Sequence, residues 1–196
     1  MYSMQKQTHT RAFLVSTPLR AQVHLLMGSN DVQPLRFVSE LAPGEPGSQS
    51  DASWTQPHTP YATWLAATDG GLPDTTTNTC RWMLGCSMGA PHGFENRRKE
   101  LVGQGRLSVT DDDVVSSFVD SVHPSSRNPW LLRYLNHCCV AVVAGKTIFT
   151  HAPLSVDRIG AVPGLSGTTN EPKDWVRALA SFARAELEAF EVSHTS

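Results

Sequence analysis

The sequence predicts an α/β fold in which helices outnumber strands. Two runs rich in β-branched residues, 139–143 and 147–151, flank the dipeptide Gly145-Lys146, and this pattern is typical of a β-hairpin. A third apolar run, residues 23–27, ends at a glycine and has the length of a buried strand. Apolar residues at helical spacing over 171–190 predict a long amphipathic helix whose inward face is formed by Trp175, Leu179, Phe182, Leu187 and Phe190.

Between the first strand and the hairpin, the sequence predicts a helix-rich insert over about residues 57–125. Thr110 followed by three aspartates is a strong helix start, because the hydroxyl caps free N–H groups and the acids face the positive end of the helix dipole. Beyond the insert, Asn128-Pro129 predicts another helix, with asparagine as the N-cap and proline in the first helical position. Asp31 is a candidate cap for a short helix directly after the first strand. Within the insert, helices are expected from Tyr61, over 75–88, over 94–102 and from Thr110.

The domain organisation expected from the sequence is one unit over residues 22–196, preceded by an irregular leader over residues 1–21. Residues 42–60 are rich in Pro, Gly and Ser and predict a loop or a disordered insertion. The first thirty residues hold three basic residues and no acidic one. An organelle transit peptide is therefore the alternative to an irregular leader, and organelle targeting the alternative to a cytoplasmic location.

Composition bounds the classes of partner. Lys and Arg number 16 and Asp and Glu 18, which gives a formal net charge of −2. Nucleic acids and anionic membranes attract basic surfaces, so neither is an expected partner. The longest apolar run, residues 138–144, is far shorter than the ~20 residues that span a bilayer. The four cysteines lack zinc-site spacing and are expected to be free thiols: Cys80, Cys86, Cys138 and Cys139.

Polar residues directly follow two of the predicted strands. Ser29, Asn30 and Asp31 come after Gly28 at the end of the first strand, and His151 ends the second strand of the hairpin. Ligands gather at strand ends in layered α/β folds, and imidazole, amide and carboxylate groups bind divalent metals. These residues are therefore candidates for a metal site. The alternatives are a simple turn with a helix cap, and a half-buried structural histidine.

Arg97 and Arg98 are candidates for holding a phosphate group. The planar guanidinium group donates paired hydrogen bonds that match phosphate oxygens. The alternative is a solvated helix face on which Arg98 pairs with Glu95, three residues earlier.

Several of these segments carry a resemblance to one family. Gly28-Ser29-Asn30-Asp31, followed by Leu35-Arg36-Phe37 and Ser39-Glu40-Leu41, is similar to the Gly-Asn-Arg-Asp, Leu-Arg-Phe and Ser-Glu-Leu stretch of a protist and bacterial group of calcineurin-like metallophosphoesterases. Thr147-Ile148-Phe149-Thr150-His151-Ala152 resembles the segment around the late His-Gly motif of that group. The order and approximate spacing of such segments hold from about residue 23 to 190. The resemblance implies part of a β-sandwich flanked by helices, of which this chain is the C-terminal portion.

The resemblance also implies a chemistry. In that family two divalent cations of the Mn, Fe or Zn type clamp a phosphate ester and activate a metal-bound hydroxide. Ser29 takes the position of the family's metal-binding asparagine, and His151 that of its late histidine. Asn30 is the catalytic candidate, because a one-residue slip would bring its carboxamide into the asparagine's place. Arg97 and Arg98 would then contact the phosphate-ester substrate.

The chain departs from the family in ways that bear on activity. Ser29 stands where the family has asparagine, and the earlier Asp-x-His and Gly-Asp-x-x-Asp motifs are not found in the sequence. A two-metal site takes about seven or eight protein ligands, including a bridging carboxylate. We therefore expect a metallophosphoesterase-like protein with impaired hydrolysis. The alternatives are a non-catalytic pseudophosphatase that binds partners through its helical insert, and a second chain that supplies the missing motifs.

The same departures predict how the chain associates. A sheet that lacks its neighbouring strands exposes unpaired backbone groups along its edge, and such edges pair with other chains. Self-association through an exposed sheet edge is therefore expected.

Overall fold

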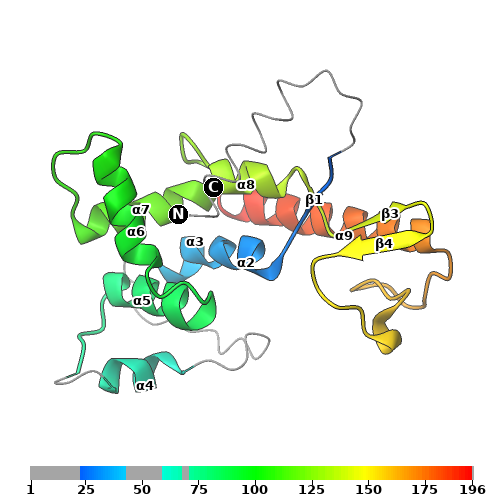
Figure 1. Ribbon diagram of the computed structural model, residues 1–196, viewed down its shortest axis with the longest axis horizontal. Coiled ribbons are helices and arrows are strands. Elements are labelled where there is room, and N and C mark those ends of the chain that lie inside the picture. The colour runs from blue at the N-terminus through cyan, green and yellow to red at the C-terminus, as the bar shows by residue number, and fades with distance from the viewer. Residues whose placement is uncertain (1–22, 43–58, 68–70, 196) are drawn as a thin grey trace.

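The computed structural model describes residues 23–42, 59–67 and 71–195 (Figure 1). The predicted leader and most of the predicted loop at 42–60 lie outside these ranges. In chain order the elements are β1 (Leu25–Leu26), α2 (Ser29–Val32), the 3-10 helix η1 (Gln33–Arg36), α3 (Phe37–Glu40), α4 (Tyr61–Ala66), α5 (Thr76–Trp82), the π-helix η3 (Met83–Ser87), α6 (Gly93–Gly103), α7 (Asp111–Val122), α8 (Trp130–Leu135), β2 (Cys138–Cys139), β3 (Ala141–Ala144), β4 (Thr147–Thr150), the 3-10 helix η4 (Val156–Arg158) and α9 (Pro172–Ser193).

The described residues form a mixed α/β structure in which helices predominate, as the sequence predicts. They contain two sheets of two strands each. β1 pairs in parallel with β2, and β3 pairs antiparallel with β4. The expected β-sandwich is not formed by these residues, because a sandwich needs two broader sheets facing each other across a core.

The hairpin is confirmed around Gly145-Lys146. Gly145 has a φ of +61°, which glycine adopts without steric cost, and tight two-residue turns require this conformation. The predicted first strand is also found, but it is shorter than expected. Only Leu25 and Leu26 pair with β2, and the Met27 N–H then donates to the carbonyl of Cys139 at 2.9 Å.

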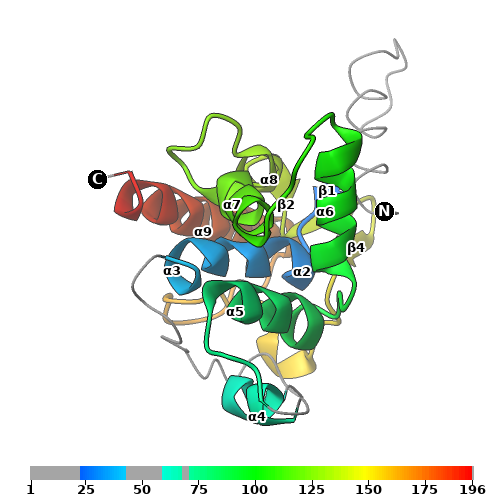
Figure 2. The same cartoon turned by 90° about the vertical axis from the view of Figure 1, so that its left-hand side faces the viewer.

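Helices α2 to α8 form one packed body, which we call the helical unit. The continuous run of α2, η1 and α3 lies in its middle, with α7 and α8 on one side and α5 on the other (Figures 1 and 2). α4 lies beyond α5, farthest from α8 (Figure 2). The buried side chains that join these helices include Phe37, Tyr61, Trp82, Met83, Leu84, Phe94, Leu101, Val114, Val122 and Leu131.

The predicted start of one helix is confirmed, and two other predicted caps differ in position. α7 begins as predicted: the Thr110 hydroxyl accepts from the Asp113 N–H at 3.1 Å, and Asp113 accepts from the Thr110 N–H at 2.8 Å. α8 begins at Trp130, one residue later than predicted. Asn128 is not its N-cap, because the Asn128 side chain instead accepts a hydrogen bond from Arg133. Asp31 does cap a helix, but from the first turn of α2 and not from the N-cap position.

α9 connects the helical unit to the rest of the chain. We call β3, β4 and residues 151–170 the hairpin lobe; β3 contacts α9, and the Trp175 indole N–H donates to the carbonyl of Ala161 at 2.8 Å. Toward the other end of α9, Leu187 packs with Leu132 and Leu135 of α8. The predicted inward face is confirmed, although Trp175 and Leu187 are buried and the other predicted members only half-buried. No helix within the described ranges has the length and apolar character to cross a bilayer.

Candidate functional site at two strand ends

The structure brings the two predicted strand ends together. Gly28 is buried between β1 and α2, and His151 directly follows β4. A Cβ placed on Gly28 would lie only 2.8 Å from Nε2 of His151, so the imidazole fills the space that any side chain at position 28 would need. Gly28 has a φ of −104°, which other residues adopt freely. A side chain at position 28 would therefore displace the exposed His151 imidazole, whereas the backbone itself does not demand glycine.

The other residues of the first strand end have unequal roles. Ser29 and Asn30 are exposed in the first turn of α2, and no hydrogen bond occupies their side chains within the described part of the chain. The Asp31 carboxylate accepts the Gly28 N–H at 2.8 Å and so closes the start of α2. The helix-cap alternative thus holds for Asp31, whose Oδ2 is engaged in this cap.

The donor set at the strand ends does not fit a pair of divalent cations. It offers the imidazole of His151, the hydroxyl of Ser29 and the carboxamide of Asn30. Two such cations carry about four positive charges, and bridging carboxylates normally offset their repulsion. Across residues 23–42, 59–67 and 71–195, His, Cys, Asp and Glu form no group of three or more that could hold a metal ion.

Arg97 is engaged inside the helical unit, away from the strand ends. Its Nε donates to Oγ of Ser117 at 3.0 Å, and its Nη1 lies 2.9 Å from Oε2 of Glu100. The Arg97 side chain is 15% exposed. It therefore joins α6 to α7, a structural role that the sequence pattern did not reveal because Ser117 lies on a different helix.

Arg98 is likewise engaged by neighbouring groups. Its Nη1 donates to the carbonyl of Val109 at 2.8 Å, and its guanidinium pairs with Asp111 and Glu95. The hydrogen bond to Asp111 raises the pKa of Arg98. The predicted pairing with Glu95 is present. α6 lies at the opposite end of the long axis from β4 (Figure 1), so neither arginine joins Ser29 and His151 in one site.

A buried polar cluster that the sequence analysis missed lies between η1, α3 and η3. Arg36 and Glu40 form a two-pronged ion pair, with Nη2 and Oε2 2.9 Å apart, and their side chains are 13% and 8% exposed. Nη1 of Arg36 also donates to Oγ of Ser87, which in turn donates to Oε1 of Gln33. The i, i+4 spacing of Arg36 and Glu40 signals the pair, but nothing local signals Ser87.

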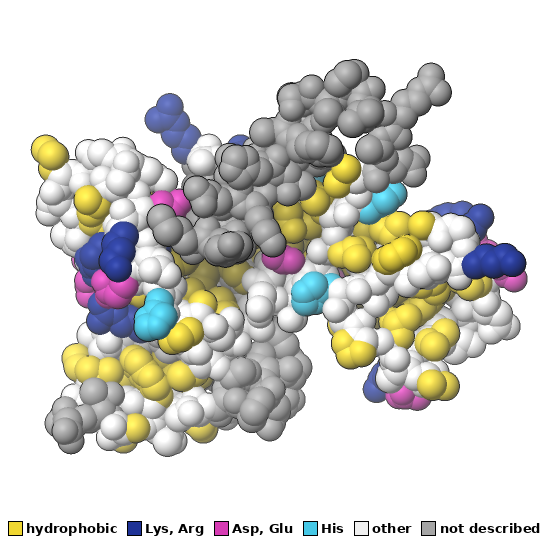
Figure 3. Space-filling model, viewed as in Figure 1, with side chains coloured by type: hydrophobic (Ala, Val, Ile, Leu, Met, Phe, Trp, Pro, Cys, Tyr) yellow, Lys and Arg dark blue, Asp and Glu magenta, His cyan; other side chains and the backbone are white. Residues whose placement is uncertain are grey.

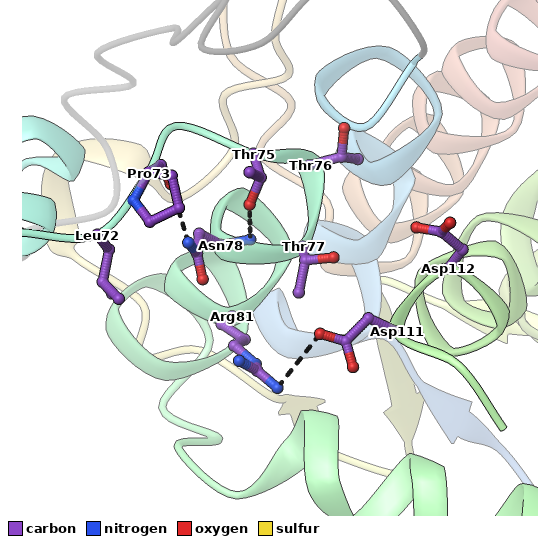
Figure 4. Close-up of a pocket in the computed structure, with 9 residues that line it drawn as sticks. All are labelled: Leu72, Pro73, Thr75, Thr76, Thr77, Asn78, Arg81, Asp111 and Asp112. Carbon is purple, nitrogen blue, oxygen red and sulfur yellow. Dashed lines mark hydrogen bonds and ion pairs between the residues drawn. The ribbon is translucent and has the colours of Figure 1, made fainter.

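A separate depression of about 570 Å³ lies between α5 and the start of α7 (Figure 4). Its lining mixes apolar, hydroxyl, amide and charged groups, and Asn78 is held by the carbonyl of Pro73 and the hydroxyl of Thr75. Arg81, its one cation, lies 3.7 Å from Asp111 and 2.9 Å from Glu95. Asp111 and Glu95 therefore already balance the charge of Arg81. The depression is separate from the strand-end site.

The cysteines are free thiols, as predicted. Burial raises the pKa of Cys80 to about 12 and that of Cys138 to about 11. Cys138 also donates to the carbonyl of Tyr134 at 3.3 Å. A protonated thiol is a poor nucleophile and metal ligand, so neither residue adds a donor to the site at neutral pH.

A scan against protein-family models and searches of curated proteins and of solved structures found no match to this chain. The family resemblance rests on sequence motifs and stays a prediction.

Proposed function

We propose that this chain is a metallophosphoesterase-like protein, related to phosphate-ester hydrolases, in which hydrolysis is impaired. The observation that carries this proposal is the contact between the His151 imidazole and Gly28. In the family that the motifs resemble, a glycine turn after a parallel strand and a late histidine serve one site. β1 is such a strand, and two segments far apart in the sequence meet at its end.

The impairment of hydrolysis follows from the residues that are available as metal ligands. A metal pair supplies this family with Lewis-acid activation of water and with charge to balance the phosphate. Ser29, Asn30 and His151 do not fit that pair, so we assign no hydrolytic step to them.

The alternative, a non-catalytic pseudophosphatase that acts as an interaction module, is favoured by a different observation. Asp31, Arg97 and Arg98, the charged side chains that a phosphoesterase site would use, are all held in contacts that stabilise the fold.

Metal content and phosphatase activity test the proposal directly. The purified chain is dialysed against Mn²⁺, and bound Mn²⁺ and hydrolysis of p-nitrophenyl phosphate are measured for the wild type, His151→Ala and His137→Ala. His137 is an exposed imidazole after α8 and serves as the matched control. We expect less than one tightly bound ion per chain and no turnover above buffer. Two tightly bound ions with turnover that His151→Ala abolishes would overturn the impairment.

The shared site is tested separately by Ser29→His. If positions 29 and 151 face one point, the two imidazoles bind Ni²⁺ together, and 1 mM Ni²⁺ stabilises the variant by about 2.7 kcal/mol for a Kd near ~10 μM. Ser29→His combined with His151→Ala removes one imidazole and is the control. Equal Ni²⁺ effects on both variants would show that the two positions do not share a site, and the family assignment would fall.

A further inference from the structure

The hairpin has two outer strand edges. β3 contacts α9, which leaves the outer edge of β4 as the candidate for pairing with another strand. β4 pairs with β3 on one side only, and within the described residues no backbone hydrogen bond joins β4 to anything else. Thr147–Thr150 contains no charged residue and no proline, the features with which natural edges prevent pairing. The edge is therefore chemically open to another strand.

The register of the hairpin fixes which backbone groups face outward. Ala144 and Thr147 flank the two-residue turn and exchange hydrogen bonds, so every second pair along the hairpin does the same. Phe149 therefore bonds to β3, whereas the N–H and C=O groups of Ile148 and Thr150 point away from it. An antiparallel partner strand would have to bond to these two residues.

The hairpin lobe also exposes apolar side chains. Five of the nine exposed large hydrophobic side chains of the described chain lie in or just after β4, and Figure 3 shows apolar surface gathered over this lobe. Phe149 is 50% exposed. The others are Leu154, Val156, Ile159 and Leu165.

We propose that β4 pairs antiparallel with β4 of a second copy of this chain, around a two-fold axis at Phe149. The outward groups of Ile148 and Thr150 then bond to Thr150 and Ile148 of the second copy, and the two hairpins join into one four-stranded sheet. Phe149 faces Phe149 of the second copy in a pair that exchanges no hydrogen bonds, where side chains approach most closely.

We favour a second copy of β4 over a charged strand of another protein as the partner. In this register Thr147 lies opposite position 151 and Lys146 opposite position 152, so no two residues with permanent like charge face each other. The interface is small against the ~1,000 Å² that stable complexes bury, so we expect a weak, concentration-dependent dimer with a Kd in the micromolar range or above. This inference does not depend on the proposed phosphoesterase relationship.

Analytical ultracentrifugation of the full chain across a ~100-fold concentration range tests the dimer. Thr150→Pro removes one outward N–H that β3 does not use, so the hairpin stays formed while the edge is blocked. Phe149→Lys places like charges on the axis. We expect each variant to raise the dimer Kd at least about tenfold, with unchanged circular dichroism. Val156→Lys, a substitution at a side chain that is 89% exposed on the same lobe, should leave the Kd unchanged.

The register is tested by Phe149→Cys. Facing residues in such pairs lie within the Cα distance range of a disulfide, so mild oxidation should yield a dimer whose cross-linked peptide joins position 149 to position 149. A wild-type chain that stays monomeric throughout would overturn the proposal and leave the edge to a strand of another protein. A dimer that survives Thr150→Pro, or higher aggregates without a dimer, would overturn it as well.

Discussion

In the helical unit the large apolar side chains are enclosed, whereas in the hairpin lobe most of them reach solvent. Met83 and Leu101 are at most 2% exposed, but Leu165 and Val156 are 65% and 89% exposed. The helices cover one another on several sides, while the hairpin is covered by α9 along β3. The difference teaches that the helical unit encloses its own core and that the lobe is stabilised from fewer directions.

Breaking the buried ion pair should have the largest effect. Glu40→Ala removes the carboxylate that forms the two-pronged ion pair with Arg36 in a site with little solvent, and we expect a loss of about 3 to 5 kcal/mol in the free energy of unfolding. Asp157→Ala removes a partner from the Asp157–Arg158 pair of the lobe, whose side chains are 74% and 80% exposed, and should change stability by less than about 0.5 kcal/mol. Urea unfolding compares the two. Equal losses of unfolding free energy would mean that the helical unit and the hairpin lobe do not differ in how an ion pair contributes to stability.

The same substitution made in both regions sharpens the comparison. Leu101→Ala opens a cavity in the core of the helical unit and should cost about 3 kcal/mol. Leu165→Ala removes a side chain that already contacts water and should cost under about 0.5 kcal/mol. Thermal unfolding followed by far-ultraviolet circular dichroism reports both values. A Leu165→Ala loss above about 2 kcal/mol would show that the lobe is covered, in a dimer or otherwise.

Two tryptophans donate the same kind of hydrogen bond in the two regions. The indole N–H of Trp82 donates to the carbonyl of Thr59, and that of Trp175 to the carbonyl of Ala161, both at 2.8 Å. Replacement by Phe removes about 1 kcal/mol in each case. For Trp175→Phe we expect faster proteolysis confined to residues 151–170, with unchanged urea unfolding of the helical unit. Trp82→Phe should lower the urea concentration at the midpoint of unfolding. The reverse pattern would contradict the division of the chain into a helical unit and a hairpin lobe.

A pH titration gives the smallest effect. Hydrogen bonds from Thr110 lower the pKa of Asp113, and a hydrogen bond from Ser155 does the same for Asp157. A lowered pKa in the folded state means that each carboxylate stabilises the fold above its usual pKa, and that this stabilisation is lost as the pH falls through the lowered value. We expect Asp113→Asn to reduce slightly the fall of the unfolding free energy at acid pH. We expect no such change for Asp157→Asn, because Asp157 lies in the hairpin lobe. An unchanged curve for both would show that the α7 cap is not linked to global unfolding.

Elements whose signals are local could be predicted from the sequence. The turn at Gly145-Lys146 and the Thr110–Asp113 cap depend on residues next to each other, and both are confirmed. The widening of α5 into η3 could not be predicted, because no residue in Met83–Ser87 marks it. It places Ser87 against Arg36, which comes from a distant part of the chain.

The candidate site follows the same rule. The meeting of two strand ends could be expected from the polar residues that follow them, and Gly28 and His151 do meet, although β1 and β4 belong to different two-stranded sheets. The engagement of Arg97 could not be foreseen, because Ser117 reaches it only once α6 and α7 pack together. Self-association through a sheet edge stays a prediction; each of the four described strands is an edge strand, and β4 is the one for which we propose pairing.

α9 has one end in each region, and this gives the chain two levels of cooperativity. Its later turns are fixed by Leu187 against α8, while its first turns depend on Trp175 and β3. Amide hydrogen exchange along this single helix should therefore slow steadily from its first turns toward Leu187. We therefore expect the hairpin lobe to open at a lower free energy than the helical unit, so that unfolding of the whole chain proceeds in two steps.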